Sequence, residues 1–232
     1  MSVAVVTGGS AGLGRALTLG LARLGWTVVT DGRSAESLAR LTDPRVVTVV
    51  GDVADAEHRR RLGEEVGRLG RLDLLVHNAS TLGPLPLRPL CDLEAADVAA
   101  VWRVNVDAAL ALTRIVLPQL RAADGILLTI SSDAAVEHYP TWGLYGASKA
   151  AADHLTLTVA EEEGLLGYAV DPGDMRTQMQ ANAFPGEDIS DRPLPETVVP
   201  KLLGLLRDRP PSGRYRAADL ESADLRPTTP GA

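Results

Sequence analysis

The sequence predicts a single α/β domain in which a doubly wound parallel sheet is covered by helices on both faces. Six short runs rich in Val, Leu and Ile recur along the chain, and longer segments rich in Leu and Ala separate them. The short runs are apolar throughout, which is typical of strands covered on both sides. The segments between them are long enough for crossover helices, and such connections favour parallel strands. The length of 232 residues suits one domain over residues 1–232.

The strands are expected at the apolar runs Val3–Val6, Thr27–Thr30, Val46–Val50, Leu72–Val76, Ile126–Ile130 and Tyr168–Val170. A further short strand near Arg214–Ala217 is predicted to complete the sheet. We expect the tail after Asp219 to be frayed, because chain ends are poorly ordered unless they are tied down.

The first helix is marked by leucines at spacings of four, four and three residues, namely Leu13, Leu17, Leu21 and Leu24. Gly25 is placed to end this helix. Helix length is also found over Val101–Leu117, Leu144–Val159 and Glu196–Arg207, and Pro118 is expected to end the first of these.

The segment 172–195 differs from the rest of the chain, because it carries four prolines. We expect it to be mostly irregular and to lie over the carboxyl ends of the strands, where such sheets bind ligands. It is a candidate substrate loop or lid.

Composition limits the partners and the compartment. The formal net charge is −7 with no basic stripe, which argues against nucleic acid as a partner. Cys91 is the only cysteine, so no intrachain disulfide can form. The strand-like run from Val3 follows Met1 without a signal-peptide pattern, so we expect a reducing, cytoplasmic location. No apolar stretch approaches the roughly 20 residues that cross a bilayer, so we expect no membrane association.

The segment Thr7–Gly14 reads TGGSAGLG and lies between the first strand and the first helix. Its glycines permit a tight turn and a close approach of the backbone to a pyrophosphate, and the amides at the start of the helix attract phosphate. The residues predicted to bind the cofactor here are Gly8, Ser10, Gly12, Leu13 and Gly14. The alternative is a loop that merely turns a strand into a helix.

The spacing TGxxxGxG resembles the classical short-chain dehydrogenase/reductase family, which has a Rossmann-like fold. Later motifs follow in the family's order, with GDV at Gly51–Val53, HNAS at His77–Ser80 and PGDMRT at Pro172–Thr177. HNAS departs from the family's NNAG at both outer residues. The resemblance implies cofactor contacts by residues of these motifs: Asp52, Val53, Asn78, Ala79, Pro172, Gly173 and Thr177. It also implies transfer of the 4-pro-S hydride.

The end of the second strand bears on the choice between NADP and NAD. An acid there accepts from the ribose 2′-hydroxyl, whereas an Arg pairs with a 2′-phosphate. The run TVVTDGR resembles the family's NADP-preferring pattern, so Arg33 is expected to meet the phosphate, and Asp31 precedes the usual place of the acid. NADP(H) is favoured and NAD(H) is possible. The alternative is that both charges are solvated loop residues.

Tyr145 and Lys149 are four residues apart in YGASK, at the start of a helical segment, so both lie on one helix face. A free phenol has a pKa of about 10, and a nearby ammonium lowers it toward working pH. Both residues are also expected to contact the cofactor, because the family's Lys holds the nicotinamide ribose. Family spacing implies that Ser132 binds the substrate oxygen and that Asn105 keeps a water in a proton relay. Strand alternation points Ser131 away from the pocket.

The loop between Ser132 and Tyr145 and the later segment are expected to wall the substrate pocket. The candidates are Asp133, His138, Trp142, Met175 and Met179. Bulky rings near the catalytic Tyr suggest an apolar or planar substrate. The alternative is that the loop packs on itself or on a partner subunit.

The expected function is hydride transfer between NADP(H) and a carbonyl or alcohol, as in a ketone or aldehyde reductase. The alternatives are a catalytically idle dinucleotide-binding sensor, a non-redox reaction with bound nicotinamide, and a structural or interaction protein. No metal is implied, because the four His and the single Cys do not cluster at ligand spacing. The resemblance implies a homodimer or homotetramer formed through the helices that carry Asn105 and Tyr145.

Overall fold

In the computed structural model, which describes residues 2–223, the chain forms a seven-stranded sheet in the order β3-β2-β1-β4-β5-β6-β7. Every neighbouring pair is parallel, which confirms the predicted doubly wound α/β class. The strands are β1 (Val3–Val6), β2 (Thr27–Gly32), β3 (Val46–Val50), β4 (Leu74–His77), β5 (Ile126–Ile130), β6 (Leu166–Asp171) and β7 (Gly213–Arg216). The strand order reverses between β1 and β4, and ligands bind outside the carboxyl ends at such a switch point.

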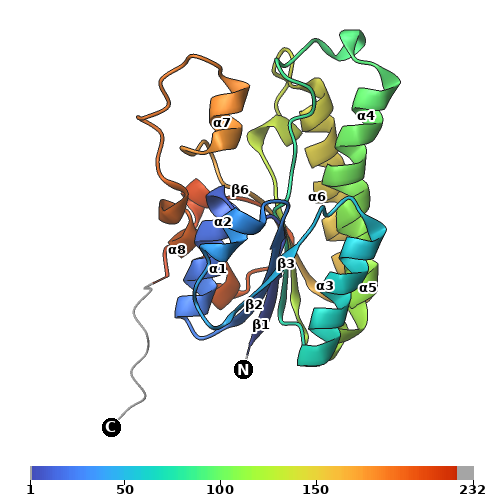
Figure 1. Cartoon of the computed structure of the whole chain (residues 1–232), viewed down its shortest axis with the longest axis vertical. Coiled ribbons are helices and arrows are strands. Elements are labelled where there is room, and N and C mark those ends of the chain that lie inside the picture. Colours follow the sequence, from blue (N-terminus) through green and yellow to red (C-terminus); the bar gives the residue numbers. More distant parts are fainter. Residues whose placement is uncertain (1, 224–232) are drawn as a thin grey trace.

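Helices cover both faces of the sheet. They are α1 (Gly12–Arg23), α2 (Ala35–Ala39), α3 (Ala56–Leu69), α4 (Ala95–Trp102), α5 (Ala108–Ala122), α6 (Gly143–Glu163), α7 (Gln178–Ala183) and α8 (Val199–Asp208). Figure 1 shows α1, α2 and α8 on one side of the sheet and α3, α5 and α6 on the other. Helix α7 lies beyond the carboxyl ends of the strands, on the side of α1 and α8.

Two hydrophobic cores lie on the two faces of the sheet, and β1 contributes to both. Ala4 and Val6 pack in the cluster that holds Leu17 of α1. Val3 and Val5 pack in the cluster that holds Leu112 of α5. Successive strand residues point to opposite faces, so an uninterrupted apolar run buries both sets of side chains.

Helix boundaries differ most from expectation around Pro118. The segment predicted as one helix over 101–117 begins as α4, passes through a π-helical turn over Arg103–Asp107 and continues as α5. Pro118 lies inside α5, which runs on to Ala122, so its prediction as the helix end was wrong. A proline removes the hydrogen bond to the carbonyl of Arg114, and both residues are exposed, so water can solvate that carbonyl.

The segment 172–195 is more regular than predicted, because it contains α7. Thr177 begins this helix, and its hydroxyl accepts a hydrogen bond of 3.2 Å from the amide of Gln180. Of the tail predicted to be frayed after Asp219, residues 224–232 lie outside the described part of the chain.

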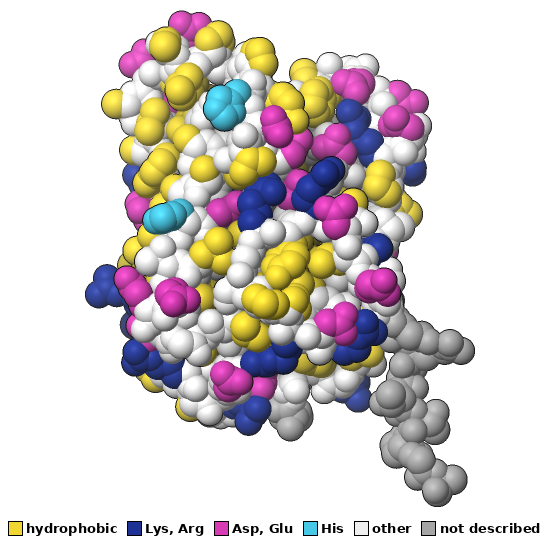
Figure 2. Space-filling model, turned by 180° about the vertical axis from the view of Figure 1, so that it is seen from behind, with side chains coloured by type: hydrophobic (Ala, Val, Ile, Leu, Met, Phe, Trp, Pro, Cys, Tyr) yellow, Lys and Arg dark blue, Asp and Glu magenta, His cyan; other side chains and the backbone are white. Residues whose placement is uncertain are grey.

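The distribution of surface charge and the character of the helices bear on binding to nucleic acid and on crossing a membrane. Figure 2 shows the face opposite to the view of Figure 1, on which acidic and basic side chains are interspersed. Over residues 2–223, no helix combines the length and apolar character that a membrane crossing requires.

Candidate active site

A cavity of about 610 Å³ lies at the carboxyl ends of the central strands, where the switch point predicts a ligand. Loops that follow six strands line it, together with α4, α6 and the segment around α7. Its walls include the glycine-rich loop as well as Tyr145 and Trp142. The cavity therefore joins the two groups of residues that the sequence singles out.

Glycine is required in the loop after β1 for conformational and steric reasons. Gly8 and Gly12 have φ values of 72° and 53°, which L side chains rarely adopt. Gly14 lies beneath the loop, where a Cβ atom would come within 2.5 Å of the Gly8 carbonyl oxygen. Gly8, Ser10, Gly12 and Leu13 line the cavity, whereas Gly14 does not and serves the packing of α1.

The turn after β4 is tied to this loop through Thr7, which was not among the predicted site residues. The amides of Asn78 and Ala79 each donate a hydrogen bond of 3.0 Å to the Thr7 hydroxyl. The side-chain amide of Asn78 donates to the Thr7 carbonyl over 2.8 Å. Thr7 thus holds the loops after β1 and β4 together, and its position directly after β1 was the only hint in the sequence.

Asp31 and Arg33 at the end of β2 have different environments. Asp31 is 2% exposed, and its Oδ1 accepts a hydrogen bond of 2.6 Å from the amide of Gly8. Arg33 is exposed, and both residues line the cavity. The view that Asp31 is a solvated loop charge is therefore wrong, because the carboxylate is buried against the glycine loop. Asp52 and Val53 also line the cavity, and Asp52 accepts from the amide of Ala54 over 2.8 Å.

Helix α6 carries Tyr145 and Lys149 on one buried face. The Lys149 ammonium lies 5.6 Å from the centroid of the Tyr145 ring and donates to the carbonyl of Ile130 over 2.8 Å. Burial lowers the pKa of Lys149 to about 8, and the nearby carboxylate of Asp153 opposes this shift.

Burial raises the pKa of the Tyr145 phenol well above its ordinary value, and hydrogen bonding by Ser132 and Ser80 opposes the rise. The expected direction was the reverse, because Lys149 was expected to lower this pKa. The phenol packs against Leu82 and Ala134 in an apolar cluster, so the cost of burying a phenolate outweighs that attraction.

Both consecutive serines after β5 line the cavity, although only Ser132 was expected to reach it, and their hydroxyls have different partners. Ser131 is buried and donates to the carboxylate of Asp153 over 2.6 Å. Ser132 lines the cavity and donates to Asp133 over 3.0 Å. The Ser132 carbonyl accepts a hydrogen bond of 2.7 Å from Arg214 of β7, a contact that nothing in the local sequence signals.

Asn105 lies in the π-helical turn and is buried. Its side chain donates to the Thr81 carbonyl and the Ser148 hydroxyl, each over 2.9 Å, and accepts from the Thr81 amide. It lines a second cavity of about 10 Å³ with His77 and Lys149. This volume is close to the space that one water needs.

His77 and Ser80 replace the outer residues of the family's NNAG motif, and both are integrated into the site. The ring of His77 lies 2.8 Å from the Thr113 hydroxyl through Nε2. Burial, and secondarily the charge of Lys149, lower the pKa of His77 to about 4. The Ser80 hydroxyl donates to Asn105 over 3.2 Å.

Four of the five predicted substrate residues line the cavity: Asp133, Trp142, Met175 and Met179. His138 does not, because it lies on the exposed side of its loop. Trp142 contacts Tyr145 edge to face at 5.7 Å and Phe184 at 5.8 Å between ring centroids. Apolar lining residues that were not predicted include Leu82, Val101, Val104 and Ala183.

The remaining predicted cofactor residues, Ala79, Pro172, Gly173 and Thr177, also line the cavity. Among residues 2–223, no three His, Cys, Asp or Glu side chains gather as metal ligands would.

Comparison with known proteins gives consistent matches. A sequence model of the short chain dehydrogenase family matches residues 2–188. The chain is 32% identical over 219 residues to the uncharacterized oxidoreductase YciK of Escherichia coli (strain K12), covering 89% of this chain and 86% of that protein. It is 35% identical over 201 residues to sepiapterin reductase of Mus musculus, covering 77% and 76%. A short chain dehydrogenase structure from Shigella flexneri 2a (strain 301), complexed with NADP, superposes with a TM-score of 0.85 at 30% identity, covering 94% of this chain and 97% of that one.

Proposed function

Because this chain belongs to the short chain dehydrogenase family and is an oxidoreductase of that family, we propose that it moves a hydride between NADP(H) and a carbonyl or alcohol carbon, as a ketone or aldehyde reductase. One observation carries the proposal: Ser132, Tyr145 and Lys149 share one cavity with the glycine-rich loop. A nucleotide seated on that loop would extend toward the phenol. When bound, NADPH supplies the hydride.

The catalytic residues supply the proton and orient the carbonyl. The Tyr145 phenol is protonated at neutral pH and can donate its proton to the oxygen of a carbonyl under reduction, while burial, which raises its pKa, makes it a weaker acid. The Ser132 hydroxyl, on the same cavity wall, holds that oxygen. Lys149 would hold the nicotinamide ribose, and a water in the small cavity beside Asn105 would supply protons to the phenol through Lys149.

The end of β2 supports NADP(H) over NAD(H). Asp31 also lines the cavity, but its two carboxylate oxygens are already engaged by the Gly8 amide and by His58, which disfavours their use by a ribose 2′-hydroxyl. Arg33 is exposed on the cavity wall, where a guanidinium can pair with a 2′-phosphate. The Shigella flexneri relative is complexed with NADP, which agrees with this choice.

The substrate end of the cavity is mostly apolar. Trp142, Leu82 and Val101 line it from the body of the domain, and Met175 and Met179 line it from the segment around α7. These side chains favour an apolar or planar carbonyl compound. Segment 172–195 then acts as a substrate loop or lid of the single domain.

We further propose that the protein is a cytoplasmic homo-oligomer, a homodimer or homotetramer formed through α4, α5 and α6. Exposed apolar side chains on two of these helices, Val98 and Ile115, support the choice of surface. Measuring the mass of the protein in solution tests the oligomeric state. A monomer at the working concentration would exclude the proposed oligomer.

The experiment that tests the function is incubation of the purified protein with NADPH and a panel of apolar ketones and aldehydes. We expect consumption of NADPH and formation of one equivalent of alcohol. NADPH binding without consumption across the panel would favour an idle dinucleotide sensor. A product formed without net consumption of NADPH would favour a non-redox reaction.

A further inference from the structure

A carboxylate is buried beside the nucleotide cradle, and neither of its oxygens is free. Oδ1 of Asp31 accepts from the Gly8 amide over 2.6 Å, and Oδ2 lies 2.8 Å from Nε2 of His58. His58 is on α3 and is fully buried. The pair therefore joins a helix to the glycine-rich loop through the end of β2.

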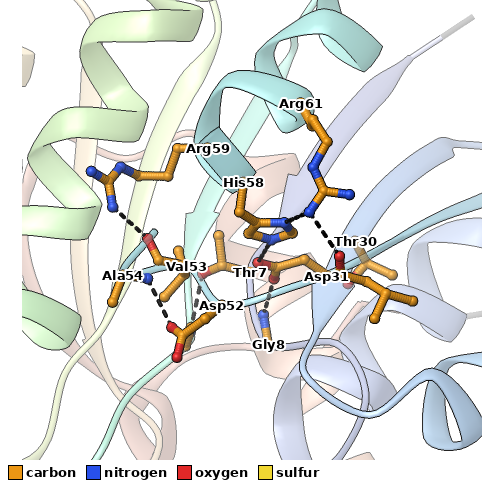
Figure 3. A network of polar contacts seen from close by, with 12 residues as sticks. Thr7, Gly8, Thr30, Asp31, Asp52, Val53, Ala54, His58, Arg59 and Arg61 are labelled. Atoms are coloured by element: carbon orange, nitrogen blue, oxygen red, sulfur yellow. Dashed lines mark hydrogen bonds and ion pairs between the residues drawn. The ribbon is translucent and has the colours of Figure 1, made fainter. Parts of the chain in front are cut away.

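The direction of this hydrogen-bond chain is set by Arg61, one turn further along α3. Figure 3 shows the His58 ring between Arg61 and Asp31. The Arg61 guanidinium lies 3.1 Å from Nδ1 of His58 and 3.0 Å from the Val50 carbonyl. A guanidinium has only donors, so Nδ1 accepts and the imidazole is neutral with its proton on Nε2. His58 thus donates to Asp31, and Asp31 accepts from Gly8.

The surroundings are built to hold this ring in place. A Cβ atom on Gly51, the first residue of GDV, would lie 2.2 Å from Nδ1 of His58, so a glycine is needed there to make room for the imidazole. An isolated buried carboxylate is costly, and beneath a phosphate site it would also repel the ligand. The Arg61 cation, at the other end of this series of hydrogen bonds, offsets both the cost of burying the carboxylate and its repulsion of the ligand.

We infer that Arg61, His58 and Asp31 form a positioning relay that fixes the backbone of the glycine-rich loop at Gly8 and thereby sets the affinity for NADP(H). None of the three side chains carries the reaction, so the relay acts on binding and leaves hydride transfer itself unchanged. It also engages both oxygens of Asp31 at the cavity wall, which leaves discrimination at the 2′ position to Arg33. The inference rests on the proposed function.

The test compares two neighbouring arginines of α3. Arg61→Ala breaks the relay at its exposed end, where the fold is least affected. Arg60→Ala is the matched control, because Arg60 is also exposed but pairs with Glu57 and Glu64 of its own helix. We expect Arg61→Ala to raise the Kd for NADPH about three- to tenfold, as couplings between nearby sites do, with kcat unchanged. Arg60→Ala is expected to match the wild type.

A second pair of variants separates positioning from general stability. His58→Gln keeps a side-chain donor that can reach Asp31, whereas His58→Leu removes it. We expect the glutamine variant to restore most of the NADPH affinity that the leucine variant loses. A merely structural role would lower the melting temperature and kcat together and would not raise the KM for NADPH selectively.

The outcomes distinguish this inference from the function on which it rests. Equal Kd values for NADPH in wild type, Arg61→Ala and Arg60→Ala would overturn the relay while leaving the proposed function intact. A wild-type protein that binds no NADPH would refute the proposed function and the relay with it.

Discussion

The ammonium of Lys149 donates a hydrogen bond of 2.8 Å to the backbone carbonyl of Ile130, the last residue of β5. This contact fixes the Lys149 side chain of α6 against β5. Ser131 and Ser132 follow directly after this strand. It also keeps the ammonium in a buried place, which is why its pKa is lowered to about 8. The charge of Lys149 is therefore lost at a lower pH than in an exposed lysine.

This pKa predicts how NADPH binding depends on pH. If the charged Lys149 holds the ribose, affinity is highest below about pH 8 and falls as the pH rises through that value, because the ammonium becomes neutral. Fluorescence titration of NADPH across this window checks the expectation. Lys149→Met should bind more weakly and lose the inflection. A wild-type affinity that stays constant through the window would contradict the assignment.

Tyr145→Phe removes the transferable proton but keeps the ring that packs against Trp142. We expect kcat for carbonyl reduction to fall by about 10²- to 10⁴-fold, the usual size of a lost general acid. The Kd for NADPH should change less than about twofold. Steady-state kinetics and nucleotide titration of the same preparation measure both quantities, and turnover close to that of the wild type would end the catalytic assignment of the phenol.

Arg33→Ala should weaken NADPH binding about tenfold or more and leave NADH binding unchanged, because only NADPH carries the 2′-phosphate. Arg40→Ala is a matched control, since Arg40 is exposed after α2 and pairs with Glu36. The ratio of the two dissociation constants is the readout. If Arg33→Ala leaves that ratio unchanged, the 2′ preference comes from another group.

His77 predicts a loss of stability in acid. Its pKa is about 4 in the folded protein and 6.5 in the unfolded chain, so the unfolded state binds more protons between these values. The free energy of unfolding should therefore be unaffected above about pH 6.5 and fall by about 3 kcal/mol as the pH drops to about 4. Urea unfolding at both ends of this window measures it, and His77→Asn should show a smaller loss. An equal loss in that variant would assign the effect to other groups.

The strands could be predicted because their signal is local. In β1 and β5, every residue is buried, so burial on both faces leaves an uninterrupted apolar run in the sequence. The glycine loop could be predicted for a similar reason. Gly8 and Gly12 adopt left-handed conformations that exclude most other residues.

The partners of the buried charges could not be predicted, because they are distant in the chain. Asp31 and His58 are 27 residues apart, and Arg214 reaches the Ser132 carbonyl across 82 residues. These contacts depend on how α3 packs against the sheet and on the position of β7 at its edge. The pKa of Tyr145 was misjudged for the same reason, since its direction depends on burial among side chains from several loops.

Hydride transfer from NADPH to a carbonyl carbon is tested most directly by labelling the nucleotide with deuterium. The protein would be given NADPH deuterated at the 4-pro-S hydrogen, together with a carbonyl compound that it reduces, and the alcohol would be analysed by mass spectrometry and NMR. The account predicts one deuterium on the former carbonyl carbon, and none when the label is at the 4-pro-R hydrogen. An unlabelled alcohol from the pro-S-labelled nucleotide would contradict it.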